Sequence, residues 1–184
     1  MARTVSPNSS ASQGLQGLTS MFEYANEDGT LQETNCGQAA AATILTHYGI
    51  FEKKTDRPNS NMTALEKRYP PDVLFGVCGT SKSQMRRMLH GNQMSLLHIK
   101  GETQLENCIK GYSPVVVMLG ISQVICGMTV PGGHWMVAYA YDKDFVYLTN
   151  YGRMSWGNFK RDWDSVVSSA IDMENKGIVP YYGG

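Results

Sequence analysis

The sequence has no net charge, no long apolar run and few cysteines, and each shortage excludes a class of protein. Its 184 residues include sixteen basic and sixteen acidic side chains. A chain without net charge has no long-range field to attract nucleic acid or an anionic membrane surface. We therefore expect partners that are recognised by shape, and no nucleic acid among them.

The longest apolar run, "PVVVMLGI" from Pro114, is far shorter than the roughly 20 residues that a membrane-spanning helix needs. The opening "MARTVSPNSSASQGLQG" lacks the apolar centre of a signal peptide. These absences predict a chain with no membrane span and a cytoplasmic location, with secretion by another route left open.

The four cysteines are widely scattered, with no C-x-x-C pair and no histidine spaced for a zinc site. They are Cys36, Cys78, Cys108 and Cys126. Free thiols therefore fit better than disulfides or metal ligands, and we expect neither a metal nor another cofactor.

A chain of this length can bury the core of one domain without metal or disulfide support. Residues 1–19 are rich in Ser, Gln, Gly and Asn, a composition that buries little apolar surface. We predict a flexible N-terminal arm over 1–19 and a single domain over 20–184. The oligomeric state stays open.

Hydrophobic periodicity and capping residues place helices mainly in the first half of the chain and strands in the second. The predicted helices cover 36–49, 62–69, 80–91, 102–111 and 158–170. The predicted strands cover 94–100, 113–120, 134–142, 145–151 and 177–184. This order favours an α+β fold with segregated layers over a doubly wound sheet.

The stretch "QETNCGQAAAATILTHYG" places a cysteine at the start of the clearest helix. Asn35 is a good N-cap and Gln38 follows three residues later, a pattern typical of a capping box with Cys36 at the first helical position. Helix N-termini lower thiol pKa values, so Cys36 is a possible nucleophile. Gly37 costs about 1 kcal/mol relative to Ala, which a substrate backbone passing close by would explain. A small buried apolar residue fits this position too.

A thiol nucleophile needs a base, and the chain has four histidines. His47 lies eleven residues further along the same helix, about 16 Å from Cys36, and is too far away. His90 and His98 fit surface or packing positions. His134 stands at the mouth of a predicted hairpin and is the best base.

Gly133 before His134 would leave open space beside the imidazole, and Trp135 follows it. If residues 141–143 form a three-residue loop, His134 stands opposite Asn150 with Cβ atoms roughly 4.5–5.5 Å apart. The Asn150 amide oxygen could then accept from the imidazole N–H and orient the ring. A two-residue loop would shift the register and separate the pair.

Four segments together resemble the papain-like cysteine peptidases, and within them the bacterial double-glycine leader peptidases and their stand-alone relatives. These segments are "LQETNCGQAAAATILTHYG", "GGHWMVAYAYDKDFVYLTN", "NYGRMSWGNF" and the F-x-x-x-W of Phe159 and Trp163. They cover about half of the chain, in the order of that family, whereas residues 51–110 carry no matching signature.

The resemblance implies a papain-like α+β fold in which a central helix carrying the cysteine packs against an antiparallel sheet carrying the histidine and the asparagine. By position it makes Cys36 the nucleophile, His134 the general base and acid, and Asn150 the residue that orients the imidazole. Gln32 matches the glutamine of the oxyanion hole, with Asn35 as an alternative donor.

The implied reaction is acyl transfer on a peptide or protein amide bond through a thioester. Water as acceptor makes the enzyme a peptidase, an amine makes it a transpeptidase, and a deamidase or a non-catalytic binding module are alternatives. We expect Gly37, Gly133 and Trp135 to border the substrate. Cys78, which also precedes a helix, is a weaker rival nucleophile because it lacks the upstream glutamine. The sequence leaves the substrate unidentified.

Overall fold

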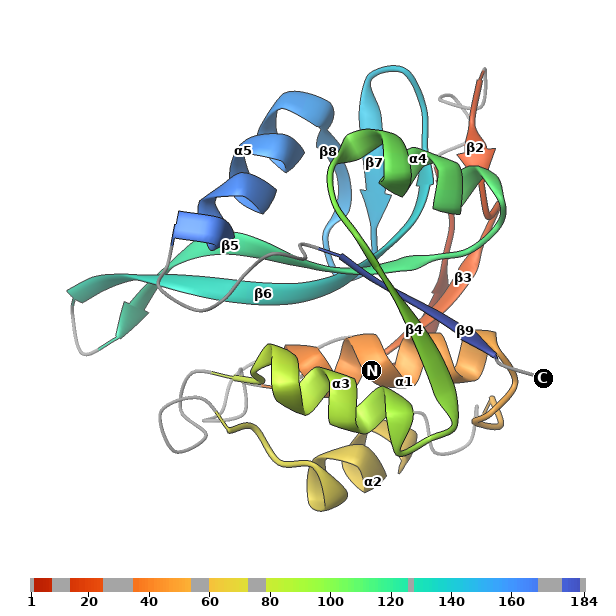
Figure 1. Cartoon of the computed structure of the whole chain (residues 1–184), viewed down its shortest axis with the longest axis vertical. Coiled ribbons are helices and arrows are strands. Elements are labelled where there is room, and N and C mark those ends of the chain that lie inside the picture. Colours follow the sequence, from red (N-terminus) through yellow and green to blue (C-terminus); the bar gives the residue numbers. More distant parts are fainter. Residues whose placement is uncertain are drawn as a thin grey trace.

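One antiparallel sheet runs through the protein, with helices on both of its faces. Figure 1 shows the computed structural model of the chain, which describes residues 2–7, 14–24, 35–53, 60–72, 79–125, 128–168 and 177–182. The helices are α1 (Cys36–His47), α2 (Ser60–Arg68), α3 (Lys82–His90), α4 (Glu102–Lys110) and α5 (Trp156–Ser168). The strands are β1 (Ala2–Val5), β2 (Gln16–Gly17), β3 (Met21–Tyr24), β4 (Met94–Ile99), β5 (Val115–Ile125), β6 (Met128–Tyr141), β7 (Phe145–Leu148), β8 (Gly152–Ser155) and β9 (Gly177–Tyr182).

The sheet has the strand order β4-β9-β5-β6-β7-β8, and β2 adds to β6. Helices α1, α2 and α3 lie on one side of it, and α4 and α5 lie on the other (Figure 1). β1 and β3 form a separate antiparallel pair. The predicted α+β class is therefore confirmed.

Strand β6 explains why both faces of the sheet are covered. Trp135, Val137 and Tyr139 belong to the core cluster that contains α1, whereas Met136 and Ala138 belong to the cluster that contains α4 and α5. Successive side chains of a strand point to opposite faces. The uninterrupted apolar run over residues 135–141 of β6 is thus that of a strand buried on both sides.

Helix α1 is buried along most of its length, from Cys36 to Leu45. Its four consecutive alanines, residues 39–42, are fully buried, as expected for a helix that is apolar on every side. The helix ends as predicted at a glycine in the left-handed region, since Gly49 has a φ of 72°. The small side chains allow α1 to pack closely between β3 and β6.

The structure differs from the predicted flexible arm over 1–19. β1 pairs with β3 from Ala2↔Tyr24 to Val5↔Met21, and β2 pairs with β6. The composition of the arm did not reveal these strands because their backbone partners come from distant parts of the chain. Residues 1 and 8–13 of the arm lie outside the described residues.

The predicted register of the β6–β7 hairpin is wrong. Tyr141 pairs with Val146, so four residues lie between the last paired positions rather than the predicted three, and a bulge shifts the register between Ala138 and Ala140. The Asp142 carboxylate closes the longer turn by accepting from the N–H groups of Asp144 and Phe145, both at 2.8 Å.

The other elements lie close to their predicted places, with three exceptions. β5 and β6 continue well beyond the predicted strands and pair with each other from Val115↔Ala138 to Ile125↔Met128. The short strands β3 and β8 were not predicted. Among the helices described, none has the length and apolar character to cross a membrane.

Candidate active site

The structure brings Cys36 to the backbone beside His134 at the start of α1. Cys36 is 4% exposed, and its Sγ accepts a hydrogen bond at 3.5 Å from the backbone N–H of Trp135, 99 positions away in sequence. His134 is the residue before Trp135, and neighbouring Cα atoms lie about 3.8 Å apart. The thiol and the residue that carries the imidazole are therefore adjacent.

Burial favours the neutral forms of both groups. Burial raises the pKa of the Cys36 thiol, although the backbone N–H groups of Trp135, Gly37 and Cys36 oppose this shift. Burial also lowers the pKa of His134. The lowered thiol pKa expected from the helix N-terminus is thus not found, because desolvation outweighs the N–H donors. A resting thiol and a neutral imidazole follow.

The predicted capping box is wrong. Asn35 is the N-cap of α1, but its side chain makes no cap hydrogen bond. Gln38 instead donates through Nε2 to the Tyr69 carbonyl at 2.8 Å and accepts from the Thr80 hydroxyl at 3.1 Å. Both polar atoms of the Asn35 amide are buried without a partner among the described residues, immediately before the cysteine.

Gly37 is explained by packing within the chain. A Cβ built on Gly37 would lie 2.5 Å from both Cβ and Oγ1 of Thr80. The space that sequence reasoning gave to a substrate backbone is therefore filled by Thr80. Only glycine allows this close approach between α1 and the segment that precedes α3.

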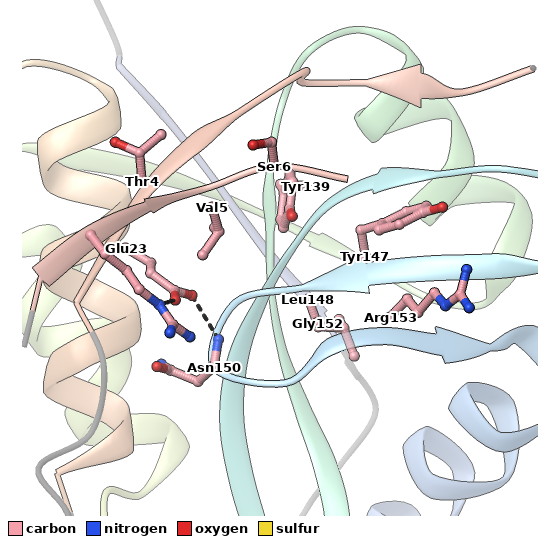
Figure 2. Close-up of a pocket in the computed structure, with 11 residues that line it drawn as sticks. Thr4, Val5, Ser6, Glu23, Tyr139, Tyr147, Leu148, Asn150, Gly152 and Arg153 are labelled. Carbon is pink, nitrogen blue, oxygen red and sulfur yellow. Dashed lines mark hydrogen bonds and ion pairs between the residues drawn. The ribbon is translucent and has the colours of Figure 1, made fainter. Parts of the chain in front are cut away.

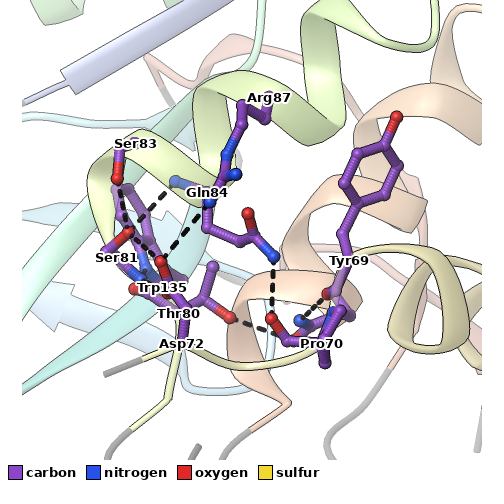
Figure 3. Close-up of polar contacts among 10 residues, drawn as sticks. Tyr69, Pro70, Asp72, Thr80, Ser81, Ser83, Gln84, Arg87 and Trp135 are labelled. Atoms are coloured by element: carbon purple, nitrogen blue, oxygen red, sulfur yellow. Dashed lines mark hydrogen bonds and ion pairs between the residues drawn. The ribbon is translucent and has the colours of Figure 1, made fainter. Parts of the chain in front are cut away.

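Hydrogen bonds hold Thr80 in place (Figure 3). The Trp135 indole donates to the Thr80 carbonyl at 2.7 Å. Next in the chain, the Ser81 side chain caps α3 by accepting from the Gln84 N–H, and Asp72 accepts from the Ser81 N–H at 2.7 Å. This network fixes the position of Thr80, which packs against Gly37 next to Cys36.

Gly133 does not offer the predicted open space. A Cβ on Gly133 would lie 2.7 Å from Sδ of Met118, so a methionine side chain occupies that position. The Trp135 side chain is 1% exposed. Trp135 acts on the site from within the core, through its indole and its backbone N–H.

Asn150 lies in the turn between β7 and β8 and is held by β3. Its backbone N–H donates to Oε2 of Glu23 at 2.7 Å, and its Nδ2 donates to the Tyr24 carbonyl at 3.1 Å. Its φ of 63° lies in the left-handed region. Figure 2 shows the Glu23 carboxylate reaching the Asn150 backbone.

Among the described residues, no hydrogen bond joins Asn150 to His134. The corrected register places the turn differently, because the Thr149 N–H donates to the Val137 carbonyl at 2.9 Å. Thr149 is therefore the residue beside Val137. Asn150 follows Thr149 and does not stand opposite His134. Within the described chain, no group donates to Oδ1 of Asn150, so this oxygen can accept a further hydrogen bond.

A cavity of about 290 Å³ adjoins Asn150 (Figure 2). It is lined by Arg3, Thr4, Val5, Ser6, Glu23, Tyr139, Tyr147, Leu148, Asn150, Gly152 and Arg153. Sequence reasoning missed Glu23 and Arg3. The signal for Glu23 was an acidic residue among the apolar side chains of "MFEY", a pattern that favours a buried and paired carboxylate.

Several predicted residues lie outside the described part of the chain. These are Gln32, the rival nucleophile Cys78, and Cys126. Of the cysteines described, Cys36 and Cys108 are free. Within the same ranges, no group of three His, Cys, Asp or Glu side chains could hold a metal ion.

The fold is shared with C39 peptidases. The peptidase domain of Streptococcus ComA, a bi-functional ABC transporter involved in a quorum-sensing pathway, matches with a TM-score of 0.58 at 16% identity, over 88% of this chain and 98% of that one. A protein from Bacillus anthracis assigned as a C39-like peptidase matches with a TM-score of 0.57 at 14% identity, over 82% and 90% of the two chains.

No protein-family model and no curated protein matches the chain. The two structural similarities confirm the predicted resemblance to the double-glycine leader peptidases and the papain-like fold. At these low identities the likeness concerns the fold.

Proposed function

We propose that the protein is a cysteine peptidase that cleaves a peptide or protein amide bond through a thioester on Cys36. The observation that supports this proposal is the hydrogen bond from the Trp135 N–H to the Cys36 Sγ, because Trp135 directly follows His134 in the chain. The fold shared with the peptidase domain of ComA supports a peptide as substrate.

The neutral thiol and imidazole define the order of proton transfers. His134 takes the Cys36 proton as Sγ attacks the carbonyl carbon, which gives a tetrahedral oxyanion. The protonated imidazole then donates to the leaving amine, and the thioester forms. His134 next removes a proton from water, water attacks the thioester, and release of the acid returns the proton to Cys36.

The oxyanion needs hydrogen-bond donors beside the cysteine. The backbone N–H of Cys36 at the start of α1 is one, and the unpartnered Asn35 amide supports a second. Gln32 is the donor that the resemblance implies. Asn35→Ala and Gln32→Ala therefore separate the two assignments, because loss of one oxyanion donor costs roughly a hundredfold or more in kcat.

Asn150 is proposed to orient His134. Its Nδ2 already donates to Tyr24, so Oδ1 is the atom that would accept from the imidazole N–H. This contact requires the imidazole and the turn to approach during the reaction. Catalytic hydrogen bonds are often long in a resting enzyme and shorten as the nucleophile reacts.

A mass measurement tests the proposal. Synthetic peptides with a central Gly-Gly pair, the sequence class that the resemblance suggests, are incubated with the wild type and with Cys36→Ala, His134→Ala and Cys108→Ala. We expect two fragments that together gain one water from the wild type and from Cys108→Ala. Cleavage by Cys36→Ala and by His134→Ala should be slower by about a thousandfold or more.

The products also distinguish the alternatives. A gain of about one dalton without cleavage would indicate a deamidase, and a joined adduct would indicate a transpeptidase. Cleavage by Cys36→Ala at the wild-type rate would contradict the assignment of the nucleophile.

A further inference from the structure

Glu23 is a buried carboxylate that the proposed mechanism does not use. Its side chain is fully buried, and both of its oxygens have partners. Oε1 accepts from Nε of Arg3 at 2.5 Å, and Oε2 accepts from the Asn150 N–H at 2.7 Å. A buried charge is costly unless it is paired and hydrogen-bonded. These two contacts therefore keep Glu23 in place.

Strand β3 connects the helix of Cys36 with the turn of Asn150. The Tyr24 N–H donates to Oγ1 of Thr43 on α1 at 3.0 Å, and the Tyr24 carbonyl accepts from the Asn150 side chain. Glu23, the preceding residue, holds the Asn150 backbone. One strand thus contacts both sides of the proposed active site through hydrogen bonds.

The surroundings of Asn150 fix its backbone conformation. Its φ of 63° lies in the left-handed region, which asparagine tolerates better than other residues with a side chain and which is retained where neighbouring groups hold it. A hydrogen bond from its N–H to a carboxylate is stronger than one between neutral groups. The charge of Glu23 therefore contributes directly to the conformation of the turn.

Arg3 supplies the cation that balances Glu23. It stands directly opposite Glu23 in the β1–β3 pair, with its side chain 60% exposed. Around this pair, the cavity is lined by the charged Arg153 and by Tyr139 and Tyr147. Burial first, and then the charge of Glu23 and the neighbouring Tyr147, raise the pKa of Tyr139 to about 12, so Tyr139 stays neutral.

We propose that Glu23 is a positioning residue for Asn150 and that Arg3, on β1, maintains this role by pairing with the carboxylate. The inference rests on the proposed function, in which Asn150 orients His134. It makes the strand pair β1–β3 part of the support of the active site.

Two readouts test the role of Glu23 without a substrate. One is the rate at which iodoacetamide labels Cys36 at pH 7, followed by peptide mass mapping. The other is the NMR resonance of the Asn150 amide proton, which a carboxylate acceptor moves downfield. Glu23→Gln should slow labelling by roughly tenfold or more, since small misplacements of reacting groups cost up to a hundredfold. It should also shift the amide resonance upfield.

A double-mutant cycle tests Arg3. Arg3→Ala should slow Cys36 labelling several-fold in the wild type and have no further effect in Glu23→Gln, because the carboxylate through which it acts is gone. Arg3→Lys keeps the cation and should recover most of the rate. Arg161→Ala is the matched control, since Arg161 is also exposed and paired with a carboxylate, that of Asp162. It should leave the labelling rate of Cys36 unchanged.

Three outcomes overturn the inference. Glu23→Gln could lower the melting temperature while leaving the Asn150 resonance and Cys36 labelling of the folded protein unchanged, which would make the pair purely structural. The effects of Arg3→Ala and Glu23→Gln could be additive. Arg161→Ala could slow Cys36 labelling as much as Arg3→Ala does. The proposed function fails separately, if His134→Ala labels as fast as the wild type.

Discussion

The helix that carries Cys36 and the turn that carries Asn150 are held in place by different forces. Around Cys36 the contacts are close packing, with the alanines of α1 fully buried and Thr80 filling the space beside Gly37. Around Asn150 they are polar and charged, from Glu23 and the Tyr24 carbonyl. The position of the proposed nucleophile therefore depends on shape, and that of the proposed orienting residue depends on charge.

This difference separates two kinds of sensitivity. A close-packed contact responds to a single added methyl group, since side chains in a core leave few voids. A charge-dependent contact responds to neutralisation even when the shape is kept. A substitution that changes only volume should therefore act on the Cys36 side of the site, and one that changes only charge should act on the Asn150 side.

Replacement of Gly37 by Ala should have the largest effect on stability. The new Cβ would meet Thr80 at 2.5 Å, and overpacking in a core costs about 1–3 kcal/mol. We expect the free energy of unfolding in urea to fall by about 2 kcal/mol. Gly157→Ala is the control, because it lies in α5 with open space around its Cβ and should gain up to about 1 kcal/mol.

Relief of the clash provides a second check on Gly37. Thr80→Gly in the Gly37→Ala background removes the atoms that the methyl group meets, so part of the lost stability should return. Equal stability of Gly37→Ala and Gly157→Ala would show that packing at Thr80 does not constrain α1.

Acid should reduce stability in two steps. His134 is half-buried, and burial lowers its pKa below 6.5, so the unfolded chain takes up this proton first as the pH falls. Stability present above about pH 6.5 is then lost, with a slope of at most ~1.4 kcal/mol per pH unit for each proton.

The second step comes from the hairpin turn. Burial alone would raise the pKa of Asp142, but hydrogen bonds from the Tyr147 hydroxyl and from the Asp144 and Phe145 N–H groups outweigh it and lower the pKa below 3.8. The stability that the ionised Asp142 carboxylate contributes is present above about pH 3.8 and is lost below it. Urea unfolding from pH 7.5 to 3 should show both steps, and Asp142→Asn should lose the second. A flat profile between pH 7 and 5 would contradict the lowered pKa of His134.

Local patterns predicted much of the helix side of the site. The start of α1 at Cys36 and its end before Gly49 follow from composition and capping residues close in sequence. The resemblance also predicted the type of fold. The reason for Gly37 was missed, because Thr80 is brought to it only by tertiary packing.

The turn side was predicted less well because its contacts are long-range. The hairpin register depended on a bulge and on the Asp142 carboxylate, neither of which alternation in a strand reveals. Glu23 lies 127 positions from Asn150, and no local rule connects the two residues. The assignments of Gln32, Gly133 and Trp135 to the substrate site stay predictions from the sequence.

Competitive labelling of the cysteines tests the central claim most directly. Wild-type protein and His134→Ala are treated with a limiting amount of iodoacetamide at pH 7, and peptide mapping gives the labelling rate of each cysteine. We predict that Cys36 is labelled first in the wild type and at least tenfold more slowly in His134→Ala, because the neutral imidazole removes the thiol proton. Earlier labelling of Cys78, Cys108 or Cys126, or a Cys36 rate that ignores His134, would contradict the account.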